Sequence, residues 1–183
     1  MRGKWVYKIK RDSQGNVAQY KARWVVKGYE QRYGIDYEET FAGVVKAMAL
    51  KVLWAFAAQY DLEVEQMDAI TAFIQGEVLE EIYVEQPTSF EAGGGPKVCR
   101  LKRALYGLKQ SAQLWQEKLS RVLQSLGYAP TSADHCIYRN AETGIVIATY
   151  VDDFLIFGPR KDQIDKLKEE LYRALKVEDL GPC

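Results

Sequence analysis

Two adjacent carboxylates, Asp152 and Asp153, interrupt an otherwise apolar stretch at residues 149–157. Burying an acid in such a stretch is costly unless it is paired or bound to a cation. A tight turn between two strands would place Asp152 at the rim of a sheet, where it could meet Asp68 at the end of another predicted strand. Carboxylates on neighbouring strands can hold two Mg²⁺ ions about 3.5–4 Å apart, an arrangement that drives in-line phosphoryl transfer. The pattern therefore indicates a magnesium-dependent phosphoryl-transfer site.

Charge is distributed unevenly along the chain, although 25 basic and 25 acidic residues give a formal net charge of +0. Residues 1–32 are basic, residues 52–96 contain acids but no Lys or Arg, and residues 97–109 are basic again. Basic flanks around an acidic centre suit a protein that binds phosphate at its edges and divalent metal in the middle. Two simpler interpretations compete with this one. The charges could form an uneven solvated surface, and an Asp-Asp pair is often an ordinary turn.

The elements that must position these side chains follow from the periodicity of the apolar residues. We expect an α+β fold in which one antiparallel sheet is covered by helices on one side. A basic face of the first hairpin, with Lys21 and Arg23 on it, calls for water or an anion. The Gly-rich residues 93–96 predict a flexible connector. The predicted strands are 5–10, 20–27, 62–68, 82–84, 98–101, 136–139, 145–150 and 153–157, and the predicted helices are 44–60, 111–126 and 162–175.

The cysteines and the lengths of the apolar runs indicate the cellular compartment of the protein. Cys99, Cys136 and Cys183 are scattered without Cys-x-x-Cys spacing, which is typical of reduced thiols in an intracellular protein. His135 next to Cys136 has no second pair at ligand spacing and is expected to be structural. No apolar run reaches the roughly 18 residues of a membrane helix, and the N-terminal residues carry no apolar stretch. We therefore expect an intracellular protein, in a cytoplasmic particle or the nucleus, without a membrane partner.

Several motifs together resemble the reverse transcriptases of Ty1/copia-type retrotransposons. Residues 150–153 (YVDD) are similar to the signature turn of reverse transcriptases, and residues 66–76 (QMDAITAFIQG) to the first metal-binding motif of this branch. Residues 100–110 (RLKRALYGLKQ) resemble its substrate-binding segment. The segments that match its fingers are residues 4–10, 20–23 and 34–41. The likeness covers nearly the whole chain in the family's order, and it implies a right-hand polymerase fold.

The resemblance also implies roles for individual residues. Asp68 and Asp152 would bind the metals, Mg²⁺ with Mn²⁺ as a substitute, supported by Asp153 and the Ala69 carbonyl. Phe73 would lie under the sugar of the incoming dNTP and exclude a 2′-hydroxyl, unless it is an ordinary core residue. The other residues implied in nucleotide binding are Lys10, Lys21, Arg23, Tyr106, Gly107 and Lys109. The residues implied in nucleic-acid binding are Tyr150 and Gln110.

For domain organisation, the resemblance implies fingers at about residues 1–60 and 77–105 and a palm at residues 61–76 and 106–183. The thumb, connection and RNase H domain of the family would be missing. The sequence departs from the family pattern at three places. The family has a basic residue where Ile70 stands, and Ser-Pro at residues 42–43. At residues 111–113 it has Ala or Ser followed by Pro-Arg.

Two functions remain open at this point. The first is an RNA-directed DNA polymerase core whose partners are a primed RNA or DNA template and dNTPs. The second is a truncated or repurposed, non-catalytic module that binds nucleic acid or protein. The surface left by a missing thumb could then support homo-oligomers.

Overall fold

The computed structural model describes residues 1–94 and 97–183, so part of the predicted connector at residues 93–96 lies outside the described residues. Its helical segments are η1 (Gly28–Glu30), α1 (Ala47–Tyr60), α2 (Ala72–Gln75), α3 (Ser111–Ser125) and α4 (Lys161–Ala174). Its strands are β1 (Gly3–Arg11), β2 (Val17–Val26), β3 (Glu63–Ala69), β4 (Tyr83–Glu85), β5 (Val98–Arg100), β6 (Ala129–Pro130), β7 (Ile137–Arg139), β8 (Val146–Tyr150), β9 (Asp153–Gly158) and β10 (Val177–Pro182). The α+β class is confirmed.

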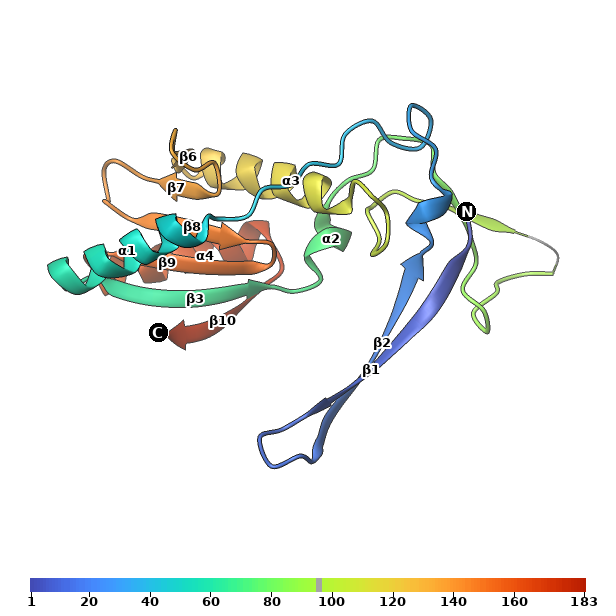
Figure 1. Ribbon diagram of the computed structural model, residues 1–183, viewed down its shortest axis with the longest axis horizontal. Coiled ribbons are helices and arrows are strands. Elements are labelled where there is room, and N and C mark those ends of the chain that lie inside the picture. Colours follow the sequence, from blue (N-terminus) through green and yellow to red (C-terminus); the bar gives the residue numbers. More distant parts are fainter. Residues whose placement is uncertain (95–96) are drawn as a thin grey trace.

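A six-stranded antiparallel sheet forms the larger part of the molecule (Figure 1), with strand order β10-β3-β9-β8-β7-β6. Side chains alternate between the two faces along each strand. One face, which includes Met67, Phe154 and Ile156, packs against α3 and α4 in the largest core cluster. Trp115 of α3 and Leu167 of α4 are buried in this cluster because apolar residues recur at helical spacing in both helices.

The opposite face of the sheet is covered by α1. Val64, Leu155 and Phe157 pack with Leu53 and Ala57 of α1, and the Trp54 and Phe157 rings meet edge to face with their centroids 5.5 Å apart. The expectation that helices cover only one side of the sheet is therefore wrong. The physical reason is that β8 and β9 are apolar at nearly every position in their middle, so both faces need cover.

A second, smaller lobe carries the N-terminal hairpin. Strands β1 and β2 form an antiparallel pair that projects away from the sheet (Figure 1), and β4 pairs with β5 beside their base. This lobe has its own small core, formed by Val26, Val78, Ile82, Val84, Ala104 and Leu108. Because the hairpin is anchored only at its base, most of its side chains are exposed.

The three predicted helices and eight predicted strands are all present, with ends that move by up to three residues. Four further elements, η1, α2, β6 and β10, were not predicted. Strand β10 pairs with β3 along residues 65–69 and thereby extends the sheet next to Asp68. No helix among the described residues is long and apolar enough to cross a membrane. Cys99 and Cys183 are exposed, Cys136 is buried, and all three are free.

Candidate active site

A two-residue turn, Val151-Asp152, joins β8 to β9 and presents Asp152 at the end of the sheet. Val151 has a φ of 56°, which is unfavourable for a β-branched residue. Hydrogen bonds from two other elements hold the turn. The Trp115 indole Nε1–H donates to the Val151 carbonyl at 2.7 Å, and the Ala69 N–H donates to the Asp152 carbonyl at 2.7 Å. Helix α3 and strand β3 therefore fix the position of the turn.

Strand β3 brings Asp68 to the same end of the sheet. Asp68 lies opposite Asp153 in the β3–β9 ladder, and Asp68 and Asp152 line one cavity of about 430 Å³. Asp153 is half-buried and accepts a hydrogen bond from Gln66 Nε2 at 3.4 Å. Asp68 and Asp152, from two neighbouring strands, thus line the same cavity, as the sequence predicted. Asp153 is the residue paired with Asp68 in the ladder.

Burial and the neighbouring acids make Asp68 harder to ionise. The pKa of Asp68 is raised by burial, then by the charges of Asp152, Asp153 and Glu178, while Lys21 opposes the rise. Two or more carboxylates that share a partly desolvated space favour a bound cation, because the cation removes this repulsion.

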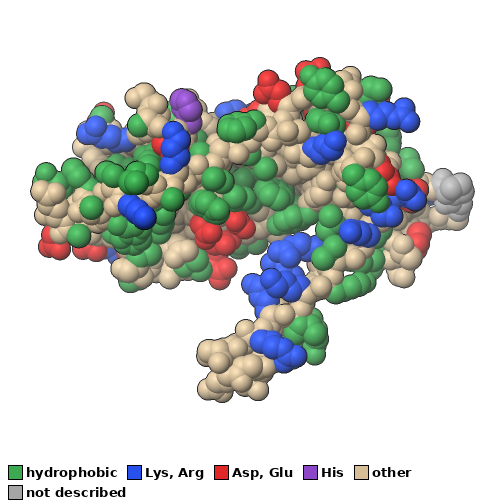
Figure 2. All heavy atoms as spheres, viewed as in Figure 1, with side chains coloured by type: hydrophobic (Ala, Val, Ile, Leu, Met, Phe, Trp, Pro, Cys, Tyr) green, Lys and Arg blue, Asp and Glu red, His purple; other side chains and the backbone are tan. Residues whose placement is uncertain are grey.

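The β1–β2 hairpin supplies the opposite wall of the same cavity. Lys10, Gln19, Lys21 and Arg23 line it, and the ladder register places them on one face of the hairpin. Figure 2 shows Lys and Arg side chains on the hairpin beside acidic side chains at the end of the sheet. The pKa of Lys21 is lowered by burial and by Arg23 and Lys10, while Asp68 and Asp152 oppose this shift.

Acids and cations face each other across the cavity without pairing. Among the described residues, no ion pair joins the hairpin cations to Asp68 or Asp152. The space between them can therefore hold a ligand that carries both negative groups and a divalent cation.

An aromatic pair, Tyr106 and Phe73, lies at the edge of this cavity. Tyr106 lines the cavity, and the Arg23 guanidinium lies over its ring at 5.1 Å from the centroid. Phe73 of α2 is half-buried and meets the Tyr106 ring with the centroids 5.0 Å apart. Phe73 thus contacts both the core of the six-stranded sheet and a residue of the cavity wall.

Gly107 has a different place from the one implied by the resemblance. It lies at the base of the hairpin, where its φ is 97° and a Cβ would be 2.0 Å from the Val26 carbonyl oxygen. A Cβ on Gly28 would in turn be 1.9 Å from the Gly107 carbonyl oxygen. Next to this contact, the Val26 N–H donates to the Tyr106 carbonyl at 2.8 Å. The two glycines allow the backbones to approach closely, and this contact sets the direction of the hairpin.

Gln110 and Lys109 also lie outside the cavity. Gln110 is only 1% exposed, and its amide group bonds to Gln31, to the Asp36 carbonyl and to Glu80. A side chain this buried offers almost no surface for direct contact with nucleic acid. Lys109 Nζ donates to the Tyr37 hydroxyl at 2.8 Å. Tyr150, by contrast, is exposed at the end of β8 beside the Asp152 turn.

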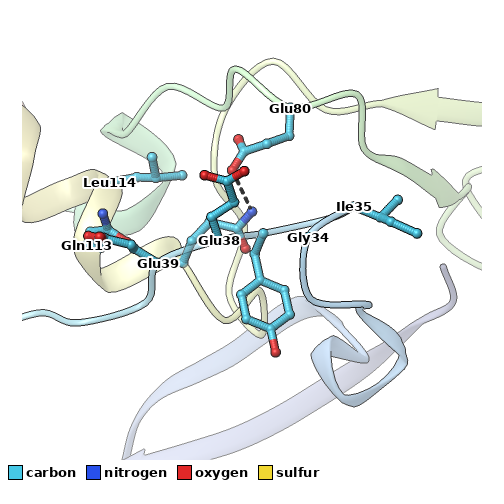
Figure 3. Close-up of a pocket in the computed structure, with 9 residues that line it drawn as sticks. Gly34, Ile35, Glu38, Glu39, Glu80, Gln113 and Leu114 are labelled. Carbon is cyan, nitrogen blue, oxygen red and sulfur yellow. Dashed lines mark hydrogen bonds between the residues drawn. The ribbon is translucent and has the colours of Figure 1, made fainter.

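A second cavity, of about 290 Å³, is lined in part by Gln110. Figure 3 shows Glu38 and Glu80 approaching this space from different segments, with the hydrogen bond between Gln110 and Glu80 marked. Glu80 Oε2 is buried without a hydrogen-bond partner. The cavity was not predicted, because only the folded chain brings residues 34–39 next to residue 80.

The carboxylates fit a hard divalent cation in kind, since Asp68, Asp152 and the Ala69 backbone all offer oxygen donors on one cavity. Within residues 1–94 and 97–183, no group of three or more His, Cys, Asp or Glu side chains is close enough to hold a metal ion together. The oxygen donors are therefore two side chains and a carbonyl rather than a three-carboxylate cluster.

Three residues of the site escaped prediction. Trp115 lies within the predicted helix 111–126, and its indole holds the turn at Val151. Gln19 lines the cavity from the hairpin, and Glu178 lines it because the unpredicted β10 pairs with β3. A capping or pairing motif that would have revealed β10 is not present in the sequence around residue 178.

The comparison with known proteins agrees with this geometry. The family model of the reverse transcriptases (RNA-dependent DNA polymerases) matches residues 1–183. The chain is 46% identical over 184 residues to the retrovirus-related Pol polyprotein from transposon TNT 1-94 of Nicotiana tabacum, covering 98% of this chain and 14% of that protein. It is 33% identical over 179 residues to the Pol polyprotein from transposon RE1 of Arabidopsis thaliana, covering 96% and 12%.

A relative outside plants is the transposon Ty1-GR1 Gag-Pol polyprotein of Saccharomyces cerevisiae, 30% identical over 172 residues, covering 88% of this chain and 9% of that protein. The chain thus spans a seventh or less of the length of these relatives. The resemblance seen in the sequence motifs is confirmed. The chain belongs to the reverse transcriptase family, in the branch of the Ty1/copia-type retrotransposons.

Proposed function

We propose that this chain is the core of an RNA-directed DNA polymerase, which adds dNTPs to a primer 3′-hydroxyl on an RNA or DNA template. The observation that carries the proposal is the cavity in which Asp68 and Asp152 face Lys10, Lys21 and Arg23 without pairing with them. A triphosphate with a bound divalent cation supplies the charges that both walls lack. Family membership supports the same reaction.

The hairpin cations would hold the triphosphate. Lys21 and Arg23 are half-buried, so their charges are less screened than those of the exposed Lys10. An Arg guanidinium already stacked on Tyr106 has fewer conformations to lose when it binds a phosphate. The hairpin would thereby orient the α-phosphorus toward the carboxylate end of the sheet.

Asp68, Asp152 and the Ala69 carbonyl would hold Mg²⁺, or Mn²⁺ in its place. When bound, two such ions lower the pKa of the primer hydroxyl and stabilise the charge of the leaving pyrophosphate. Asp153 would act as a positioning residue through its hydrogen bond with Gln66. The hydrogen bonds from Trp115 and Ala69 to the turn would keep Asp152 in place through the reaction.

Phe73 and Tyr106 would select the sugar. Their rings are in contact, so a sugar that lies on Tyr106 would come close to Phe73 and leave no room for a 2′-hydroxyl. Tyr150, exposed beside the turn, would contact the primer strand. Gln110 would serve indirectly, because it links the start of α3 to residues 31 and 36.

The two lobes would correspond to the fingers and palm of a right-hand polymerase. The fingers would contain the hairpin, β4 and β5 with their own core, and the palm would contain the six-stranded sheet with α3 and α4. Helix α1 packs on the sheet, so we place it with the palm although it falls within residues 1–60. Two exposed free thiols, Cys99 and Cys183, fit a reducing intracellular compartment.

Primer extension with a single dNTP, in Mg²⁺ or Mn²⁺, tests the proposal. Asp152→Asn removes a ligand charge and keeps the shape, so it should abolish extension while leaving the unfolding transition unchanged. Asp61→Asn is the matched control, because Asp61 is exposed at the other end of β3 and Asn also tolerates its φ of 50°. An Asp152→Asn variant that extends primers as fast as the parent would refute the assignment of the site.

One observation favours a second function, an interaction module. Met48, Val52, Phe56 and Tyr60 form an exposed apolar stripe along the outer side of α1. Successive members are four residues apart, which is the ridge spacing of packed helix pairs. Lys51 is the single charged residue of α1, so two copies of the helix can meet without strong repulsion. We propose a second copy of this chain as the occupant.

Sedimentation across a salt series separates the two functions. A module should form dimers that persist at high salt and that Val52→Glu dissociates. A monomeric chain at high concentration would remove this second function and leave the polymerase proposal intact.

A further inference from the structure

A third cavity, of about 330 Å³, carries positive charge only. It lies between α2, α3 and the end of α4, and its lining contains the cations Arg103, Lys118, Arg173 and Lys176. No Asp or Glu is among its lining residues, in a chain that has 25 acids for 25 bases. Four cations in one hollow repel each other unless they are solvated or bind an anion, so this concentration favours an anionic ligand.

The cations come from separate parts of the chain and are held by the fold. Lys176 is fixed by its backbone, because Gln75 Nε2 donates to its carbonyl at 2.9 Å and its N–H donates to Gln75 Oε1 at 2.9 Å. Arg103 is held by a backbone bridge to Glu77. A favourable interaction with the dipole of α4 would account for the presence of Arg173 and Lys176 near the C-terminus of that helix. It would not account for Arg103 and Lys118, which lie elsewhere in the chain.

The charges are also available for binding. Arg173 has Glu169 as an ion-pair partner at 3.6 Å, but the two side chains are 76% and 70% exposed, so this pair is weak. Arg103, Arg173 and Lys176 are exposed and Lys118 is half-buried. A ligand with several phosphate groups can therefore replace water around all four.

An aromatic side chain in the same lining identifies the class of ligand. Tyr172 is 49% exposed and lines the cavity beside Arg173. Cations beside an exposed aromatic ring are typical of single-stranded nucleic-acid sites, where the cations contact the backbone and the ring stacks on a base. Inorganic phosphate would use the cations but not the ring.

The basic cavity is also continuous with the candidate active site. Thr71 lines both cavities, and the Ile70 N–H donates to the Lys176 carbonyl at 2.9 Å. The segment at residues 70–71 is thus a shared wall, and a strand that leaves one cavity can pass directly into the other.

We infer that the basic cavity binds the phosphate backbone of a single-stranded stretch of nucleic acid and stacks one base on Tyr172. This second contact goes beyond the proposed polymerase reaction, and it can be measured without catalysis. The two ideas therefore fail separately: Asp152→Asn should bind an unprimed strand as the parent does, even where extension is lost.

Fluorescence anisotropy with a labelled, unprimed single-stranded RNA across a KCl series tests the inference. The double substitution Arg173→Gln/Lys176→Gln removes two phosphate contacts, so the slope of log K against log salt should become shallower by about 1.4. Tyr172→Leu should weaken binding roughly tenfold with an unchanged slope, because it removes stacking but no charge. Both measurements are repeated in a Lys21→Gln/Arg23→Gln background. This shows whether the loss of RNA affinity in the cavity variants is independent of the hairpin cations.

The matched control is Lys51→Gln/Arg139→Gln, which removes two exposed cations that do not line the basic cavity, one on α1 and one on β7, and should leave binding unchanged. If a cavity variant unfolds, Arg103→Gln/Lys118→Gln provides a second version of the test. Equal losses in control and cavity variants would overturn the inference. It would also be overturned if inorganic phosphate bound the cavity while the substitutions left RNA binding unchanged.

Discussion

Gly107→Ala should move the hairpin away from the candidate active site, although Gly107 does not line the cavity. Its Cβ would lie 2.0 Å from the Val26 carbonyl oxygen and 2.7 Å from Val25 Cγ1. Contacts below 3.0 Å are essentially never seen for a real Cβ, so the backbones must separate by at least about 1 Å. The hydrogen bond from the Val26 N–H to the Tyr106 carbonyl, 2.8 Å long, lies next to this contact and would be lengthened or lost.

The expected magnitude follows from three contributions. An L-residue at positive φ costs about 1–2 kcal/mol. Loss of the hydrogen bond adds about 0.5–1.5 kcal/mol. The reduced freedom of the unfolded chain returns about 0.4–1 kcal/mol. The free energy of unfolding should therefore fall by about 0.5–3 kcal/mol. Because a misplacement of about 1 Å can cost roughly 100-fold in rate, kcat/KM for a dNTP should fall by about that factor.

Gly15→Ala is the matched control. Gly15 lies at the tip of the same hairpin with a φ of 87°, but nothing lies within 4 Å of its Cβ position. This variant carries the cost of positive φ without the clash, so its kcat/KM should stay at the parent value. Urea unfolding and single-nucleotide extension measure the two effects. If Gly107→Ala and Gly15→Ala proved equal in both, the idea that the glycine contact positions the hairpin would be refuted.

Three further predictions follow from the same geometry. Phe73→Ala should admit ribonucleotides in a misincorporation assay, and a variant that rejects them as firmly as the parent would reduce Phe73 to a core residue. Charge reversal at Lys21 and Arg23 should raise KM for dNTPs more than Kd for a primed duplex, and the opposite order would contradict their place at the triphosphate. Burial raises the pKa of Glu65, but the ion pairs with Lys161 and Lys168 outweigh burial, and the folded-state pKa is lowered. Ionised Glu65 therefore stabilises the fold at pH values above its unfolded-state pKa. This stabilisation is lost as the pH falls through the folded-state pKa. Thermal unfolding measured from neutral to acid pH should show this loss of stability. Glu65→Gln should make the dependence of stability on pH less steep and should cost about 3–5 kcal/mol at neutral pH. An equally steep dependence in the variant would exclude Glu65 as the source of the loss.

Local periodicity was sufficient to predict most of the fold. Helix α3 was expected at residues 111–126 and occupies Ser111–Ser125, because its apolar residues recur at helical spacing. Strand β10 was missed because it reads as polar loop: Glu178 and Asp179 are charged, and Gly181 and Pro182 are turn formers. It becomes a strand only through pairing with β3, more than a hundred residues earlier in the chain.

The site divides in the same way. Asp68 and Asp152 could be predicted as partners because each lies where a strand ends, and strand ends meet at sheet edges. The roles of Gly107 and Gln110 could not, because they depend on a close approach to residues 26–36, far away in the sequence. The resemblance implied a substrate-binding segment here, and the structure places Gly107 in a close backbone contact with Val26 and Gln110 in a buried group of hydrogen bonds.

A chain of zero net charge binds polyanions only if its charges are kept apart, and the fold does this in a specific way. The hairpin cations and the cavity carboxylates are close enough to influence each other's pKa, as Lys21 and Asp68 do, yet no ion pair forms between them among the described residues. The close contact of Gly28 with Gly107 explains why, since it ties the hairpin to a direction that holds its cations across the cavity from the sheet. If the hairpin bent so that Lys21 paired with Asp68, the cavity would lose the separated charges on which the proposed binding of a metal-bound triphosphate depends. The rigidity of the hairpin base is therefore as necessary for the proposed reaction as the carboxylates themselves.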